Sequence, residues 1–400
     1  MPILLLLVVL TGACVSRRDP ADARQAGPQV SDSESPAQLD RLVDDVCTRS
    51  VVLLGEEGNH AGGHTAVVKS ELVKRLIERC GFDAVYFESS AYEFYDLNRR
   101  LAAGTSAREQ VADAIGGLWS TSKAIDPLVD YLYTQASTGR VRLAGLDPQV
   151  ATATSGYEKA ALANDLLSGM DEPRRSTCAA EISRHTLWRY DAEHHYEDAA
   201  RVSLAECFRD AGNASERDSF FSIAAQATEA VLMDPPVDRY WDTRERQMAR
   251  LFRWNQQRSP GASRVVVWTA NLHAAKSSGG LKAAVRPFGE ELQAEYGDRL
   301  ASIAFTALGG SYGRREPTPV AAAGPESLEA RALAGGADAL RYLSSSALAR
   351  LGAVDAKVFG YDKTSRADWS LLFDAVVVLR EERPLGSDYP PKPRFVPPPN

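Results

Sequence analysis

Residues 51–76 read VVLLGEEGNHAGGHTAVVKSELVKRL, and the predicted architecture rests on this stretch. The four apolar residues from Val51 to Leu54 form a short run that is typical of a buried strand. From His64 onward, apolar residues recur at spacings of three and four, which predicts a helix that ends at Gly81. A strand, a loop and a helix in this order are the repeating unit of a parallel α/β sheet.

The same alternation continues along the chain. Apolar runs predict further strands at residues 83–89, 140–147, 263–273, 300–310, 356–362 and 373–381. Helical periodicity predicts helices at residues 91–101, 106–115, 126–136, 287–295 and 326–344. We therefore expect one α/β domain at residues 39–383, with a mostly parallel sheet flanked by helices. Between about residues 151 and 257 only amphipathic helical patterns occur, so we expect an inserted all-helical subdomain there.

The two ends of the chain have a different composition. Residues 1–14, MPILLLLVVLTGAC, are an apolar run too short for a comfortable membrane span and resemble a signal peptide. Its last residues resemble a bacterial lipobox, in which Cys14 would carry the lipid. Residues 15–38 have the composition of a flexible tether, and residues 384–400 form a Pro-rich tail. We expect an exported protein of the cell envelope, either anchored to the membrane through Cys14 or free in the periplasm or outside the cell.

Composition limits the classes of partner. The chain has 400 residues, of which 44% are hydrophobic, and this is enough to bury a large core. Its formal net charge of -7 provides no positive field to attract a phosphate backbone. We therefore expect no nucleic acid partner, and the net charge is compatible with cationic or neutral small molecules.

Four cysteines remain apart from Cys14, and an exported chain can join them in disulfides. Local order suggests the pairs Cys47 with Cys80 and Cys178 with Cys207. The alternative is four buried thiols, because a domain of this size needs no covalent staples.

Polar side chains follow four successive predicted strands. The first strand leads to Glu56, Glu57 and His60, and the second, third and fourth lead to the remaining candidates, Glu88, Asp147, Asn271 and His273. Ligands of open parallel sheets bind beyond the carboxyl ends of the strands, so we expect these side chains to meet. Such a set suits hydrolysis, with His60 as the base that takes a proton from water and nearby carboxylates that orient it.

Two nearby residues have simpler explanations. His64 follows His60 by four residues and could share a helix face with it, but a histidine that caps the helix or lies in solvent is the commoner case. Trp119 is interpreted as core or pocket wall. The glycine-rich loop lacks the spacing of a nucleotide-binding motif, and no Gly-x-Ser-x-Gly elbow supports a serine nucleophile.

These residues resemble the erythromycin esterase family. The resemblance runs through Gly55 with its glutamates, His60, Lys69, GFDAVYFE at 81–88, GLWS at 117–120, LAGLD at 143–147, RERQM at 244–248, WTANLH at 268–273 and DWSLLFDAVVVLR at 368–380. It implies a hydrolase that activates water on an ester or lactone with a metal-independent His and Glu set and no cofactor. By position, the resemblance implies His60 as the general base, Glu88 and one of two adjacent glutamates as its partners, and His273 as a second catalytic histidine. The candidate substrate-binding residues are Lys69, His64, Trp119, Asp147, Arg244 and Asn271.

Two departures from the family pattern leave alternatives open. The segment GEEGNH has one residue more than Gly-Glu-x-x-His, so either Glu56 or Glu57 is the motif carboxylate. Ala270 stands where macrolide esterases carry a histidine, which places macrolide cleavage in doubt.

A second hypothesis is a non-catalytic envelope lipoprotein that binds haem or a metal through His60, His273 and Glu88.

Overall fold

The computed structural model describes residues 35–150, 156–191, 195–234, 240–259, 263–279 and 285–388. The predicted signal sequence with Cys14 lies outside the described residues, as does the Pro-rich tail beyond residue 388. Helix α1 (Ser35–Val46) begins inside the segment predicted as a tether, so regular structure starts earlier than residue 39. Within the described part of the chain, no helix combines the length and apolar character needed to cross a membrane.

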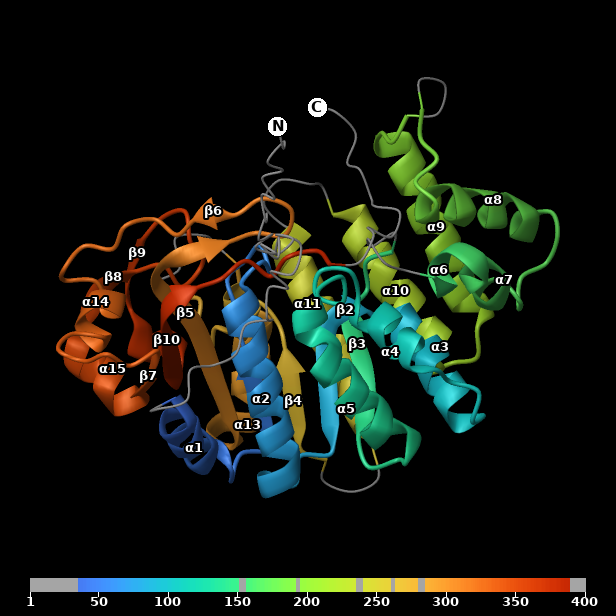
Figure 1. Cartoon of the computed structure of the whole chain (residues 1–400). Helices are drawn as coiled ribbons and strands as arrows, with labels where there is room; N and C mark the ends of the chain where they lie inside the picture. The colour runs from blue at the N-terminus through green and yellow to red at the C-terminus, as the bar shows by residue number, and fades with distance from the viewer. Residues whose placement is uncertain are drawn as a thin grey trace, which may run out of the picture.

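The main sheet has eight strands in the order β3-β2-β4-β1-β5-β10-β7, with β6 paired to the end of β5 (Figure 1). Their bounds are β1 (Val51–Leu54), β2 (Ala84–Ser90), β3 (Arg142–Asp147), β4 (Val265–Trp268), β5 (Leu300–Tyr312), β6 (Thr318–Pro319), β7 (Leu340–Ser344) and β10 (Ala375–Glu382). Only β6 and β7 run antiparallel to their neighbours in this sheet. The expected mostly parallel sheet is confirmed. Strands β8 (Ala353–Ala356) and β9 (Ser365–Asp368) form a separate antiparallel pair.

Helices cover both faces of the sheet because both faces of its central strands are apolar. Val52 and Leu54 of β1 pack with α1, α2 (Gly63–Cys80), α4 (Arg108–Ile115) and α5 (Asp126–Ser137). Val51 and Leu53 belong to the opposite cluster, which includes α11 (Tyr240–Gln257), α13 (Phe288–Tyr296) and four shorter helices, α12 (Asn271–Ala274), α14 (Leu328–Ala332), α15 (Ser345–Leu351) and α16 (Trp369–Leu372). The continuous apolar run of β1 follows from this burial on both sides.

A third apolar cluster lies mainly in the segment that was predicted to be all-helical. It contains residues of α7 (Leu162–Leu166), α8 (Arg174–Thr186), α9 (Asp198–Ala214) and α10 (Phe220–Met233), and α6 (Tyr157–Ala160) contributes Tyr157. The cluster includes Ala91 and Tyr92 of α3 (Ala91–Ala102), so these helices pack beside the β3 edge of the sheet (Figure 1). His185 is buried against Trp188, Tyr190 and Tyr196, although its neighbours along the chain are polar or charged.

Two predicted elements were wrong. The helix predicted at residues 326–344 is the short helix α14 followed by β7, because Gly335 and Gly336 interrupt it and Leu340 to Leu343 pair with β10. The strand predicted at residues 356–362 is an irregular segment after β8. Its apolar residues Val358 and Tyr361 are fully buried as a loop, which produces the same short apolar run as a strand.

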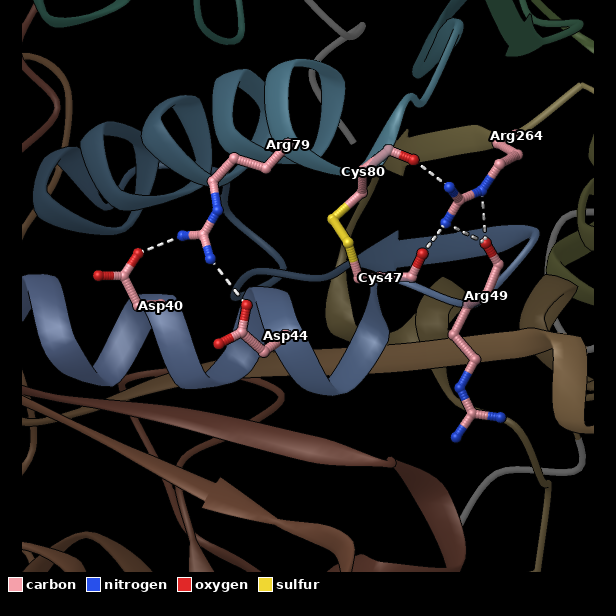
Figure 2. The surroundings of a disulfide bond; sticks show 7 residues. All are labelled: Asp40, Asp44, Cys47, Arg49, Arg79, Cys80 and Arg264. Atoms are coloured by element: carbon pink, nitrogen blue, oxygen red, sulfur yellow. Dashed lines mark hydrogen bonds and ion pairs between the residues drawn. A yellow bond between two sulfur atoms is a disulfide. The ribbon is translucent and has the colours of Figure 1, made fainter.

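Both candidate disulfides are present, between Cys47 and Cys80 and between Cys178 and Cys207. Figure 2 shows the first, which joins the end of α1 to the end of α2. The Arg264 guanidinium donates hydrogen bonds to the backbone carbonyls of both Cys47 and Cys80. The disulfide and the hydrogen bonds of Arg264 connect the end of α1 to the end of α2, at the ends of the strands opposite the polar loops.

Candidate active site

Strand order brings the polar loops together. β4 lies between β1 and β2, although it follows β3 in the chain. Leu54 pairs with Trp268, and Trp268 pairs with Phe87, so β1 and β4 end level with the residue of β2 that precedes Glu88. The loops after them surround a cavity of about 820 Å³ whose polar lining includes His60, Glu88, Asp147, Arg244, His273 and Arg314.

Glu56 lies at the floor of this region, with an exposed fraction of 2%. Its Oε1 accepts hydrogen bonds from the indole Nε1 of Trp119 at 2.9 Å and of Trp268 at 3.1 Å. The Nδ1 of His60 lies 3.0 Å from the same oxygen, and the Nζ of Lys69 lies 3.4 Å from it. Four donor groups therefore surround Oε1 of Glu56 and hold its side chain in place.

These donors keep Glu56 ionised. Burial by itself raises the pKa of the carboxyl group, but the Lys69 ammonium and the His60 ring outweigh it and lower the pKa. Lys69 is fully buried, and its Nζ also lies 4.2 Å from the centre of the Trp268 ring. Burial lowers the pKa of Lys69 to about 8, although Glu56 raises it.

His60 is oriented by Glu56. An ionised carboxylate has no proton to donate, so the hydrogen of their bond must sit on Nδ1 of the imidazole. Nε2 is then the ring atom that can accept a proton, and it lies 3.9 Å from Oε1 of Glu88, beyond hydrogen-bond distance. The edge of the ring contacts Trp119, with the ring centres 5.1 Å apart. This arrangement leaves the basic nitrogen available on the cavity side.

Glu57 has a different environment. Its two carboxylate oxygens accept hydrogen bonds from the backbone N–H groups of Asn59 at 2.9 Å and Ala61 at 3.0 Å. Burial raises the pKa of this carboxyl group, against the effect of the two amides. Glu57 thus shapes the loop, while Glu56 contacts the His60 ring.

Glu88 is an anchor for several donors. Oε2 accepts from the Thr269 hydroxyl and the Ala270 amide, each at 2.8 Å, and Oε1 lies 2.9 Å from Nε2 of His273. The pKa of Glu88 lies well below its usual value, because His273, His60 and Arg244 outweigh the effect of burial. A carboxylate with such a low pKa is a weak base, and its charge holds the neighbouring cations in place.

Arg244 connects the ends of two strands. Its Nη2 lies 3.0 Å from Oε1 of Glu88 and 2.7 Å from Oδ2 of Asp147. Its Nη1 lies 3.0 Å from Nε2 of His273. Asp147, predicted as a substrate-binding residue, lines the cavity and also binds Arg244.

His273 is enclosed by carboxylates. Nδ1 forms a hydrogen bond with Glu245, and Nε2 faces Glu88. Burial alone lowers the pKa of the imidazole, but the two carboxylates, Glu245 and Glu88, outweigh burial and raise the pKa to about 10. A raised pKa keeps the imidazole protonated, so His273 suits the role of a cation better than that of a base.

Three predicted substrate-binding residues do not line the cavity. Asn271 is fully buried, and its side chain forms hydrogen bonds with the backbone of Phe305 and Val358. It packs against Gly55 so closely that a Cβ atom at position 55 would lie 2.1 Å from its Oδ1. The side chain of His64 faces the Glu381 carbonyl at 2.9 Å. Lys69, expected in the cleft, lies behind Glu56. Asn271 and His64 stabilise the loops, whereas Trp119 lines the cavity as expected.

Sequence reasoning missed three residues that shape the site: Trp268, Glu245 and Arg314. Trp268 ends a strand and Glu245 follows Arg244, so both stand inside quoted motifs, although nothing marked their contacts. Arg314 follows β5, and no sequence signal pointed to it. Among the described residues, no group of three or more His, Cys, Asp or Glu side chains is arranged to hold a metal ion.

Comparison with solved structures finds similar folds. A protein of Bacillus cereus matches with a TM-score of 0.65 and 15% identity, covering 86% of this chain and 92% of its own. A succinoglycan biosynthesis protein matches with a TM-score of 0.68 and 15% identity, covering 90% and 95%. A histidine-to-asparagine mutant of the erythromycin esterase EreC, in its open conformation, matches with a TM-score of 0.61 and 16% identity, covering 86% and 93%. A comparison with curated proteins returned no match.

The family comparison is more specific. The family model described as erythromycin esterase matches residues 77–381. The matched range includes Glu88, Asp147, Arg244 and His273, and it begins after the loop that carries Glu56 and His60. On this match and on the shared architecture, the chain belongs to the erythromycin esterase family.

Proposed function

We propose that this protein hydrolyses an ester or lactone of a small molecule, with His60 as the general base that activates water. The observation that carries the proposal is the buried hydrogen bond between His60 Nδ1 and Glu56 Oε1, at 3.0 Å. It places the acceptor nitrogen of the ring on the cavity side, beside Glu88. Membership of the esterase family supports the same class of reaction.

The proposed reaction is a direct attack by water. His60 Nε2 takes one proton from water, and the oxygen attacks the carbonyl carbon of the ester. Glu56 stabilises the imidazolium that forms, because its own charge is maintained by Lys69. The tetrahedral intermediate then expels the alcohol, which receives the proton from His60.

The cationic side of the cavity would stabilise the negative oxygen of that intermediate. Arg244 and His273 both line the cavity and are held there by Glu88. Fixed charges in a site shielded from water stabilise a transition state without reorganisation. In this proposal Glu88 and Asp147 position the cations and do not exchange protons.

The test is hydrolysis of a panel of activated esters and lactones, macrolides included, by the purified protein. We expect His60→Ala to reduce turnover by roughly 100-fold or more. The control is His195→Ala, which removes an exposed histidine of the helical region. Activity that survives in His60→Ala would contradict the proposal. Turnover that is lost on adding a chelator would contradict the expected metal-independent mechanism.

We further propose that the protein works in the cell envelope. Two disulfides are typical of an oxidising compartment. Mass spectrometry of the mature N-terminus would detect a lipid on Cys14 or a cleaved signal, and an unprocessed Met1 would contradict export by this signal.

A further inference from the structure

The loop that carries His60 has an unusual backbone conformation. The φ angle of His60 is +53°, in the left-handed region that residues with a side chain seldom adopt. Such a conformation persists only where surrounding contacts impose it. Contacts to the backbone of His60 therefore control where its ring points.

Arg314 supplies such contacts from a distant part of the chain. It lies two residues after β5, and its Nη2 is 2.8 Å from the carbonyl oxygens of both Asn59 and His60. The Nε of the same guanidinium donates to the carbonyl oxygen of Leu118 at 3.2 Å. Next to it, the Gly313 amide donates to Ala61 at 3.0 Å.

The third carbonyl links this contact to Glu56. Leu118 precedes Trp119, whose indole donates to Glu56 and whose ring contacts the His60 ring. One guanidinium thus joins the loop of the base to the turn that supplies Trp119. These two segments lie far apart in the sequence, and Arg314 adds a backbone link to the side-chain contacts of Trp119 with Glu56 and His60.

We propose that Arg314 is a positioning residue for the His60 base, acting through the backbone carbonyls of Asn59, His60 and Leu118. Its planar fork can reach two segments at once, whereas a lysine ammonium is a single point on a flexible stem. The kinetic part of this proposal rests on the proposed hydrolase function. The position of the His60 ring does not, and it can be measured separately.

The first measurement is proton NMR of the full-length protein, with the imidazole resonance of His60 identified by its loss in His60→Ala. We expect this resonance to move in Arg314→Ala and to return when guanidinium chloride is added at millimolar concentration. Sodium chloride at the same concentration controls for salt. Arg315→Ala removes the neighbouring exposed arginine and is expected to leave the resonance unchanged.

The second measurement is steady-state hydrolysis of whichever ester the wild type cleaves. We expect Arg314→Ala to reduce kcat by roughly 10- to 100-fold with KM changed less than about two-fold, since misplacement of a catalytic group affects the chemical step. Guanidinium should restore part of kcat in Arg314→Ala and none in His60→Ala. Arg314→Lys should remain impaired although it keeps the positive charge.

The outcomes are distinct. An unchanged His60 resonance in a folded Arg314→Ala would overturn the proposal, and so would a full kcat. A lower kcat that guanidinium does not restore, together with a general loss of thermal stability, would show that Arg314 only supports the fold. A resonance that responds as expected in a protein that cleaves no ester would support the positioning role and contradict the hydrolase function.

Discussion

Replacing each of the adjacent glutamates by glutamine separates their roles. Glu56→Gln keeps the shape of the side chain but removes the charge that faces His60 and Lys69. A neutral amide cannot stabilise the imidazolium, and it can present an N–H group where His60 needs an acceptor. Glu57→Gln changes a side chain that bonds only two loop amides among its described hydrogen bonds.

The expected magnitudes differ for the two variants. Loss of an oriented base partner reduces kcat by roughly 10²- to 10⁴-fold, which corresponds to about 3 to 5 kcal/mol of activation free energy. Glu57→Gln leaves one of two buried amides without an acceptor and should lower the free energy of unfolding by about 1 to 3 kcal/mol. Its kcat should stay within roughly tenfold of the wild type, because the His60 ring keeps its partner.

The assay is the initial rate of ester hydrolysis by both variants, together with urea unfolding followed by circular dichroism. The unfolding curves show whether each variant is folded under the conditions of the kinetic assay. Equal losses of kcat in the two variants, or near-normal activity of Glu56→Gln, would refute the assignment of Glu56 as the partner of His60.

Three further predictions concern stability. Asn271→Ala should lower the free energy of unfolding by about 3 kcal/mol or more, measured by urea titration, because three backbone groups lose a buried partner. Removing the Cys47–Cys80 bond, which spans 33 residues, should cost about 3 to 4 kcal/mol by loop entropy; a Tm unchanged in the Cys47→Ser variant would contradict this. His273 binds its proton more tightly in the folded state, since its pKa rises from 6.5 to about 10. Its contribution to the free energy of unfolding is thus complete below pH 6.5 and is lost as the pH rises through about 10. The difference in the free energy of unfolding between wild type and His273→Gln should therefore shrink over this pH range. A difference that does not change with pH would contradict the prediction.

Much of the fold could be predicted because its signals are local. The run from Val51 to Leu54, the helix that ends at Gly81 and the strand that ends at Asp147 each have a hydrophobic period that reads directly as an element. The wrongly predicted strand at residues 356–362 lies where the buried residues do not follow the spacing of a helix or a strand. Val358 and Tyr361 are as apolar as strand residues, yet they are buried in a loop.

The site was predicted as a set of residues but not as an arrangement. Polar residues at strand ends identified His60, Glu88, Asp147 and His273, which all line the cavity. The same reasoning selected Asn271, because position along the chain does not reveal which way a side chain turns. The Asn271 side chain forms hydrogen bonds with the backbone of β5 and thereby stabilises the segment that follows β4.

The amino-acid sequence by itself determined which segments become strands and helices and which residue types stand at the strand ends, since both depend on neighbours along the chain. Only the tertiary structure decided that Glu56 and not Glu57 faces His60, that His273 lies between two carboxylates, and that Arg314 reaches the His60 loop. These contacts depend on the position of β4 between β1 and β2 in the sheet and on the pairing of β5 with β1. Charges and hydrogen bonds across such non-local pairings set the chemistry of the site, because the dielectric is low and every buried polar group needs a partner.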